Sequence, residues 1–302
     1  KVVEEWVSKK EAHVVYALAP GEYILHEEQA PTEQGYVRAE DVKFVVEETG
    51  DVQKVKMEDD HTKVSISKTD ITDGKEIEGA KLQVLDQDGE VVESWTTGEE
   101  HLIEYLPVGT YTLHEEAAVD GYIVANDVEF TVEETGEIQK VKMEDERAMG
   151  QLVIVKTDAD SKAALEGVEF VLLEKETGKE VGRLKTGKDG KAVSELLPIG
   201  TYENGVFKEP ITYVLKETAA LNGYQKTEEE WEIVFTYQND KTPVIEVVKE
   251  IQNKKTPETP GTVKPGPKTG DDTNWFLPLL ALGASAGMVA GLLYYRKRHK
   301  KA

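Results

Sequence analysis

Short segments in which apolar and polar residues alternate run through most of the chain, and turn signals separate them. Stretches such as TKVSISK (62–68) and YTLHEE (111–116) place Val, Ile, Leu or Tyr at every second position. Asp-Gly and Thr-Gly pairs recur between such segments, for instance at 73–74 and 135–136. A period of two with frequent turns is typical of strands that bury one face. We therefore expect an all-β chain of antiparallel, Ig-like β-sandwiches.

The alternating segments form a tandem repeat of roughly 86 residues. Residues 41–59 and 127–145 match at fifteen of nineteen positions, and GEYILHEE at 21–28 aligns with GTYTLHEE at 109–116. A third, diverged unit keeps the same order of strands and turns. The predicted repeat units are a truncated one at 1–60 and complete ones at 61–146 and 147–253.

An uncharged run of 21 residues, 275–295, lies near the end of the sequence. As a helix it would be about 31 Å long, close to the roughly 30 Å hydrocarbon core of a bilayer. Aromatic residues at its ends and the basic tail 296–302 predict a transmembrane helix whose tail lies in the cytoplasm. A buried core helix is the alternative, which the basic flank disfavours.

The segment that precedes this run, 254–269, contains four prolines and no core-forming pattern. At about 3 Å per residue an extended segment of this length would reach roughly 50 Å. That reach would suit a linker crossing part of a cell wall, although a disordered tail would have the same composition.

Composition narrows the function. Asp and Glu number 59 against 36 Lys and Arg, which gives a net charge of −23 and disfavours nucleic-acid binding. The absence of cysteine excludes disulfides, thiolate metal sites and cysteine nucleophiles. No phosphate loop, catalytic Ser/His/Asp set or metal-ligand spacing is present, so we expect no cofactor and no metal. The sequence begins with Lys1 rather than Met. We therefore interpret the sequence as the C-terminal part of a longer precursor.

Three strands of the second unit aim an ionisable side chain into the apolar interior. Lys68 shares the parity of the apolar residues in its strand, and Glu115 and Asp145 do the same in theirs. Free charges at such positions would be costly. The third unit repeats the pattern, although Lys249 interrupts the alternation before its last member; the residues are Lys156, Glu217 and Asn253. In the first unit the lysine strand would precede the sequence, which leaves Glu27 and Asp59.

These units resemble the B-type (Cna-B, SpaA-like) repeat domains of Gram-positive collagen adhesins and pilins, and the second also resembles a streptococcal domain split into a self-ligating tag. The shared motif is Glu-x-x-x-x-x-Gly-Tyr, found at 115–122 and 217–224. The resemblance implies prealbumin-like sandwiches that each form an intramolecular isopeptide bond. It would join Lys68 to Asp145 and Lys156 to Asn253, with Glu115 and Glu217 as the catalytic residues.

The chemistry of buried ionisable groups is consistent with isopeptide-bond formation. Burial lowers the pKa of a lysine and raises that of a carboxyl by up to about 3–5 units. A neutral amine could then attack a neutral acid once, which is a single-turnover reaction rather than enzymatic activity. A buried Lys–Glu–Asp salt-bridge triad is the alternative interpretation.

The pentapeptide GPKTG at 266–270, with the apolar run and basic tail, resembles the sortase sorting signal of Gram-positive surface proteins. The resemblance implies cleavage between Thr269 and Gly270 in the motif that Pro267 and Lys268 begin, and transfer of the threonyl carboxyl to peptidoglycan. Gly266 stands where leucine is usual. An ordinary single-pass anchor that is never cleaved is the alternative.

Together these features predict a secreted, cell-wall-anchored adhesin stalk whose host ligand would contact a region upstream of Lys1. A pilin subunit is one alternative, although no Tyr-Pro-Lys-like motif is present; the anchor region of a cell-wall enzyme is another. His26 and His114 are interpreted as solvated strand residues, and Trp6 and Trp95 as packing residues. The 86–89 segment is interpreted as a hairpin turn rather than a calcium loop.

Overall fold

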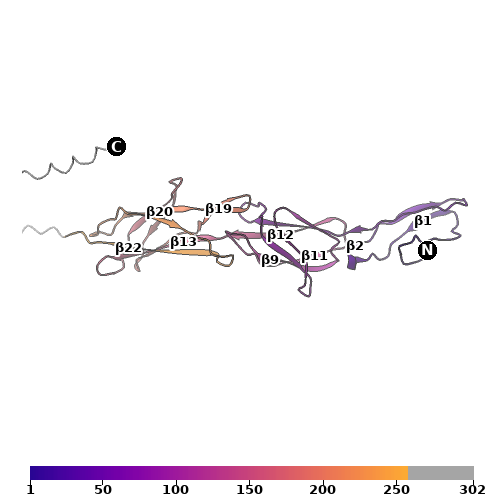
Figure 1. Ribbon diagram of the computed structural model, residues 1–302, viewed down its shortest axis with the longest axis horizontal. Helices are drawn as coiled ribbons and strands as arrows, with labels where there is room; N and C mark the ends of the chain where they lie inside the picture. Colours follow the sequence, from indigo (N-terminus) through magenta and orange to yellow (C-terminus); the bar gives the residue numbers. More distant parts are fainter. Residues whose placement is uncertain (258–302) are drawn as a thin grey trace, which may run out of the picture. The chain divides into compact units, whose positions relative to one another are not determined.

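The computed structural model describes residues 1–257, and nearly all regular structure in them is β-strand (Figure 1). One short 3-10 helix, η1 (Thr32–Gln34), is the exception within this range. The predicted all-β class is therefore confirmed. Within residues 1–257 no helix has the length and apolar character needed to cross a bilayer. The predicted transmembrane helix at 275–295 and the tail at 296–302 lie outside the described residues, as does the linker beyond residue 257.

The second unit is a sandwich of two four-stranded sheets. One sheet has the order β10-β12-β5-β8 and the other β11-β9-β6-β7. Its apolar residues alternate along the strands, so each sheet turns one face to a common core that includes Val64, Leu82 and Leu113. The strands are β5 (Lys63–Asp70), β6 (Lys81–Leu85), β7 (Val91–Thr96), β8 (His101–Glu104), β9 (Gly109–Ala117), β10 (Tyr122–Ile123), β11 (Val128–Val132) and β12 (Ile138–Arg147).

The third unit repeats this sandwich and adds a hairpin. In one sheet β13 pairs with β16, β17 and β22, and the other sheet has the order β15-β14-β20-β21. The added hairpin consists of β18 and β19. The strands are β13 (Met149–Asp158), β14 (Glu169–Glu174), β15 (Glu180–Lys185), β16 (Lys191–Val193), β17 (Leu197–Pro198), β18 (Gly200–Glu203), β19 (Val206–Pro210), β20 (Thr212–Ala219), β21 (Glu230–Val234) and β22 (Val244–Asn253).

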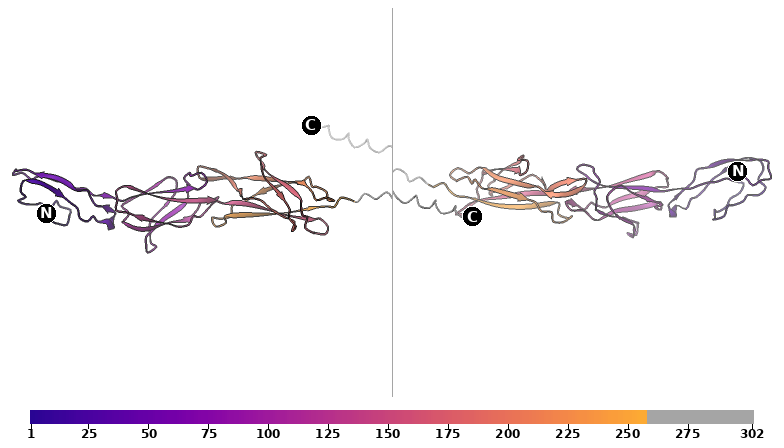
Figure 2. Two further views of the ribbon diagram at one scale, coloured as in Figure 1. Left: turned by 180° about the vertical axis from the view of Figure 1, so that it is seen from behind. Right: turned by 45° about the horizontal axis from the view of Figure 1, so that its top comes forward.

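The first and last strands of each complete unit are neighbours and run in parallel. β5 pairs with β12, and β13 pairs with β22; the second of these pairs lies side by side in Figures 1 and 2. The expectation of purely antiparallel sheets is thus wrong at this place. The intervening strands cross to the other sheet before the chain returns, so the last strand can enter beside the first in the same direction.

The alternation of the last strand also explains Lys249. This residue lies on the inward parity of β22 and is half-buried. Its ammonium lies 5.9 Å from the centroid of the Trp231 ring, within the range of a cation–π contact. The strand therefore continues to Asn253 without a change of register.

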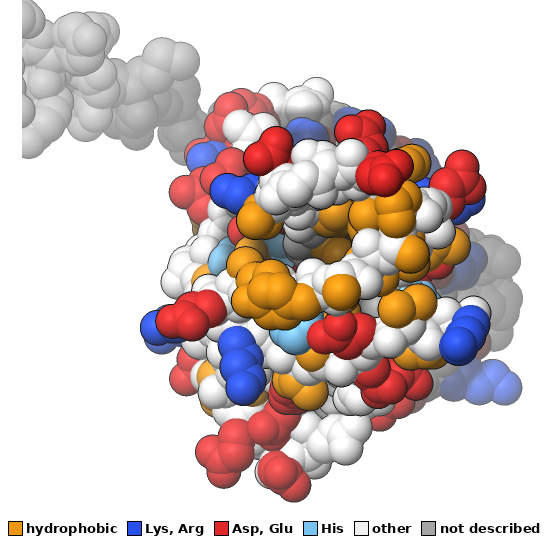
Figure 3. All heavy atoms as spheres, turned by 90° about the vertical axis from the view of Figure 1, so that its right-hand side faces the viewer, with side chains coloured by type: hydrophobic (Ala, Val, Ile, Leu, Met, Phe, Trp, Pro, Cys, Tyr) orange, Lys and Arg blue, Asp and Glu red, His pale blue; other side chains and the backbone are white. Residues whose placement is uncertain are grey.

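The first unit has fewer strands than the other two. β1 (Gly21–Leu25) pairs with β3 (Val42–Val46), and β2 (Tyr36–Val37) pairs with β4 (Asp60–His61). The segment 51–59, which matches β12 in sequence, forms no strand. Apolar side chains remain exposed here, including Ile24 at 56% and Val45 at 59%. Figure 3, which looks at this end, shows hydrophobic side chains around a hollow.

Gly150 on β13 lies so close to a core side chain that we expect no larger residue to fit there. A Cβ built on Gly150 would lie 2.2 Å from the ring Cγ of buried Phe235, whereas one on Gly182 would meet nothing within 4 Å. We expect Gly150→Ala to destabilise the third unit by about 1–3 kcal/mol and Gly182→Ala to leave it nearly unchanged. Thermal unfolding of the full chain checks this; equal midpoints for the two variants would contradict the packing.

Candidate functional site

The second unit brings Lys68, Glu115 and Asp145 together in its core. They lie on β5, β9 and β12, and their exposed fractions are 1%, 2% and 0%. The Lys68 Nζ is hydrogen-bonded to Asp145 Oδ1 and lies 2.9 Å from Glu115 Oε2. The three residues predicted from strand parity therefore form one cluster.

Strand register creates this cluster. In the parallel pair β5–β12, Met143 lies opposite Lys68, and Asp145 is the next residue of β12 on the same face. Glu115 enters from the facing sheet, where β9 pairs with β6 and places Leu82 opposite it. The apolar residues of all three strands anchor their faces inward, so the ionisable residue at the end of each pattern must follow them.

Burial controls the protonation of the second-unit cluster. Loss of solvation raises the pKa of Asp145 to about 7, with a further contribution from Glu115 and against the opposing charge of Lys68. Glu115 Oε1 and Asp145 Oδ2 have no hydrogen-bond partner although both are buried. Orphaned polar atoms of this kind are uncommon in native cores. The cluster can therefore hold a neutral acid against an amine in a dry site.

The third unit brings Lys156, Glu217 and Asn253 into the corresponding position. Their exposed fractions are 0%, 4% and 2%. Asn253 Nδ2 donates a hydrogen bond of 2.6 Å to Glu217 Oε1. The Lys156 Nζ donates to the backbone carbonyl of Ile251, at 3.5 Å, and this residue precedes Asn253 by two on β22. The amine thus lies beside the strand that carries the amide.

The third-unit lysine is shifted toward its neutral form. Burial lowers the pKa of Lys156 to about 8, against the opposing charge of Glu217. Burial also raises the pKa of Glu217, against the hydrogen bond from Asn253 and the charge of Lys156. The buried oxygens Glu217 Oε2 and Asn253 Oδ1 have no partner. The unprotonated, nucleophilic form of the Lys156 amine is therefore more accessible near neutral pH than that of an ordinary lysine.

The first unit does not bring its two predicted residues together. Glu27 is half-buried and accepts a hydrogen bond of 2.8 Å from the Ala39 amide. Asp59 is exposed, so its expected inward position is not observed. Residue parity fixes a buried face only where a segment is paired in a sheet, and 51–59 has no partner strand in the described part of the chain.

The remaining sequence candidates do not add a second site. Pro267, Lys268, Thr269 and Gly270 lie outside the described residues. Asp86 accepts the amides of residues 88 and 90, as expected for a hairpin turn. His26 and His114 are partly exposed and pair with Asp41 and Asp127, at 2.6 and 2.7 Å. Within residues 1–257 no cluster of His, Asp and Glu is arranged to bind a metal ion.

Trp6 and Trp95 each stack on a histidine. The ring centroids of Trp6 and His13 are 4.4 Å apart, and those of Trp95 and His101 are 4.2 Å apart. Trp95 also packs against the core of the second unit. These contacts agree with the interpretation of both residues as packing residues.

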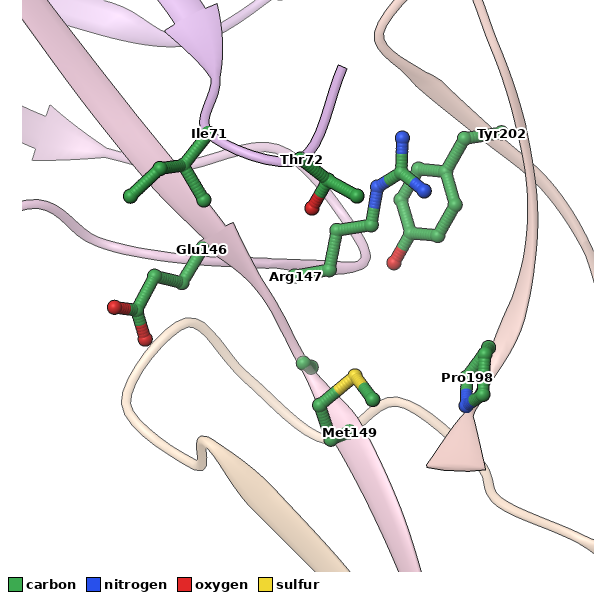
Figure 4. A pocket seen from close by; sticks show the side chains of 8 residues that line it. Ile71, Thr72, Glu146, Arg147, Met149, Pro198 and Tyr202 are labelled. Atoms are coloured by element: carbon green, nitrogen blue, oxygen red, sulfur yellow. The ribbon is translucent and has the colours of Figure 1, made fainter. Parts of the chain in front are cut away.

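A shallow pocket lies where β12 leads into β13 (Figure 4). The Arg147 guanidinium lies 4.1 Å from the Tyr202 ring centroid and donates to Asp70 and Asp73, at 2.6 and 3.0 Å. Its charge is therefore already satisfied within the protein. The lining residues are Ile71, Thr72, Glu146, Arg147, Ala148, Met149, Pro198 and Tyr202.

Sequence reasoning missed a second pair of polar residues in each complete unit, an inward aspartate hydrogen-bonded to a tyrosine. Tyr122 donates to Asp70 at 2.7 Å, and Tyr224 donates to Asp158 at 2.8 Å. The available signal was the tripeptide Lys-Thr-Asp, which occurs at 68–70 and again at 156–158.

Comparison with known proteins shows that the chain matches the model of one protein family. The model of the SpaA prealbumin-like fold domain matches residues 1–61, 62–147 and 150–210. No curated protein matches the chain significantly.

Three solved structures illustrate the likeness. The Bacillus anthracis TIE protein is 30% identical over 78% of this chain, with a TM-score of 0.49, and the chain spans 42% of its length. The Streptococcal ancillary pilin is 19% identical over 80% of this chain and 76% of its own, with a TM-score of 0.30. The shaft pilin SpaA of Lactobacillus rhamnosus GG is 15% identical over 66% of this chain and 99% of its own, with a TM-score of 0.26.

The lowered pKa of Lys156 predicts a pH-dependent stability when no bond to residue 253 can form, as in Asn253→Ala. The folded value of about 8 lies below the ordinary 10.5, so between these values the unfolded chain binds more protons. The free energy of unfolding should therefore rise by about 3 kcal/mol as the pH increases across this window. This added stability should be lost again as the pH falls through 8. Denaturant unfolding measures it, and adding Lys156→Met should remove the slope. A slope that persists in the double variant would contradict the assignment.

Proposed function

The chain belongs to the SpaA family of prealbumin-like fold domains, and on this premise we propose that its second and third units each close an intramolecular isopeptide bond. The bonds would join Lys68 to Asp145 and Lys156 to Asn253. The observation that carries the proposal is the repetition of one buried arrangement: an amine on the first strand, a carboxyl or amide on the last, and a glutamate between them.

In the second unit the reaction is a condensation that releases water. The lone pair of Lys68 Nζ attacks Cγ of Asp145, whose raised pKa favours the protonated, electrophilic acid. Glu115, 2.9 Å from the amine, accepts a proton from it and returns a proton to the departing oxygen. One C–N bond forms, one C–O bond breaks, and the product amide carries no charge into the core.

In the third unit the leaving group is ammonia. The unprotonated amine of Lys156 attacks Cγ of Asn253, and the amide nitrogen departs. Asn253 Nδ2 lies 2.6 Å from Glu217 Oε1, so a protonated Glu217 is within reach to give that nitrogen the proton that it needs to leave, and Glu217 regains a proton from the attacking nitrogen. One C–N bond forms, one C–N bond breaks, and ammonia is released. The raised pKa of Glu217 makes the protonated form accessible. Folding supplies the high effective concentration that an uncatalysed amide exchange lacks.

The bond would suit a chain that has no cysteine and so cannot form a disulfide. It connects the first strand of each unit to the last, across a sequence separation of 77 residues in the second unit. A disulfide at this place would restrict the unfolded chain in the same way but would be open to reduction. We infer that the units serve as a covalently locked stalk.

Intact mass tests the bonds. We expect the full chain to be lighter than its sequence by one water and one ammonia, because each unit condenses once. Glu115→Gln should abolish the loss of water and leave the loss of ammonia. Glu116→Gln is the matched control, since Glu116 is the exposed neighbour on the same strand. An unmodified wild-type mass would show that the clusters are salt bridges only.

We further propose that the chain is attached to peptidoglycan by a sortase, through Pro267, Lys268, Thr269 and Gly270. The support is the order of the three sequence features: the Pro-Lys-Thr-Gly motif, the apolar run 275–295 and the basic tail. The repeat units would then act as a spacer that extends from the point of wall attachment.

Incubation with a purified Gram-positive sortase and an amine acceptor tests this attachment. We expect release of residues 270–302 and a product that ends at Thr269 linked to the acceptor, which mass spectrometry of the C-terminal peptide detects. Thr269→Ala should abolish the product. Release of the same product from Thr269→Ala, or no cleavage by sortases of several classes, would contradict the proposal.

A further inference from the structure

A second hydrogen bond accompanies the reactive cluster in both complete units, buried in the second and partly buried in the third. Asp70 is 0% exposed and accepts from the Tyr122 hydroxyl at 2.7 Å; Asp158 is 1% exposed and accepts from the Tyr224 hydroxyl at 2.8 Å. Neither bond touches the amine or the carbon that would react. Their recurrence in two diverged units calls for a function that both units share.

The aspartate of this bond is tied to the reactive residues by strand geometry. Asp70 follows Lys68 by two on β5 and is the register partner of Asp145 on β12. Asp158 follows Lys156 by two on β13 and is the register partner of Asn253 on β22. The aspartate is therefore beside both reacting residues, on the same buried face.

Hydrogen bonds hold this aspartate as an anion. In the second unit, Asp70 differs in this respect from its register partner Asp145. The Oδ1 of the aspartate accepts backbone amides of the following turn, from Thr72 in the second unit and from Ser161 in the third, both at 2.7 Å. For Asp70 burial raises the pKa, but the hydrogen bonds from Tyr122, Thr72 and Arg147 together lower it below its ordinary value. An anchored carboxylate is a poor electrophile, so it does not compete for the lysine.

The tyrosine of this bond is tied to the catalytic glutamate. Tyr122 follows Glu115 by seven residues, and three residues later the Ala125 amide donates to Glu115 Oε2 at 2.6 Å. In the third unit Thr227 occupies the corresponding place, three residues beyond Tyr224. In the second unit, the backbone that holds the glutamate is thus fixed just beyond the tyrosine.

We propose that these hydrogen bonds, Asp70–Tyr122 and Asp158–Tyr224, act as a positioning latch for isopeptide formation. The latch ties the first strand, two residues beyond the lysine, to the segment that follows the catalytic glutamate. In the second unit an amide of this segment, from Ala125, also holds Glu115. The latch and the pairing of the first and last strands then hold the lysine, the glutamate and the last-strand partner in fixed positions relative to one another. Both tyrosines are positioning residues, and the inference rests on the proposed isopeptide chemistry.

The rate of bond formation in the full chain tests the latch. The chain is synthesised in a pulse-labelled cell-free system with mild detergent, and digests are taken over time. The two bonds are distinguished by mass, since one loses water and the other ammonia. We expect Tyr122→Phe to slow the loss of water about tenfold to a hundredfold and to leave the loss of ammonia unchanged. Tyr224→Phe should do the reverse, so each unit is the folding control of the other.

Two further variants separate positioning from general support of Asp70. Arg147→Gln removes another donor to the same oxygen, Asp70 Oδ2, but leaves the tyrosine bond, and should keep a rate within about threefold of wild type. Asp70→Asn retains a carbonyl acceptor for Tyr122 and should react faster than Asp70→Ala. Limited proteolysis at the earliest time point reports whether the second unit has folded; should Tyr122→Phe not fold, the Tyr224→Phe rates decide.

Three results would overturn the latch: wild-type rates in both tyrosine variants, equal slowing of both bonds by either one, or a slowing by Arg147→Gln as large as that by Tyr122→Phe. A wild-type chain that loses neither water nor ammonia would instead overturn the proposed function itself. The two failures are therefore distinguishable in one experiment.

Discussion

The parallel pairing of the first and last strands is the constraint on which the site depends. It sets Lys68 and Asp145, and equally Lys156 and Asn253, two register positions apart on one buried face. A slip of one residue would turn the acid or amide toward solvent, because side chains alternate across a strand. The hydrophobic positions of the four strands prevent that slip, so ordinary core packing also fixes the chemical geometry.

This placement is unfavourable until the charges are removed. An ammonium and two carboxyls in a dry core lose solvation that their mutual attraction repays only with good geometry. Four buried oxygens of the two clusters lack hydrogen bonds, which adds to the penalty. Conversion of the amine and the acid into a neutral amide would remove the cost of burying these charges. The same desolvation that destabilises the unreacted state also raises the pKa of Asp145 and lowers that of Lys156.

The units show one arrangement realised with different local chemistry. The second unit presents a carboxylic acid at the last strand and the third an amide, so in the proposed reaction the glutamate would have a different leaving group to protonate in each. Besides the tyrosine, Asp70 accepts from Arg147 and the Thr72 amide, whereas Asp158 accepts from the amides of Asp160 and Ser161. The first unit keeps the glutamate contact to a backbone amide without a paired closing strand. The glutamate loop is therefore formed locally, and the reactive pair is formed only by the sheet.

The sequence by itself determined the all-β class, the repeat and the inward residues of the complete units, because a period of two and internal matches are local properties of the chain. Lys68, Glu115, Asp145, Lys156, Glu217 and Asn253 could be selected in this way. It could not determine that the first and last strands run in parallel, that Asp59 lies at the surface, or that Asp70 and Asp158 pair with tyrosines. Those features depend on which strands become neighbours, and partners far apart in the chain are chosen only when both sheets close over a common core.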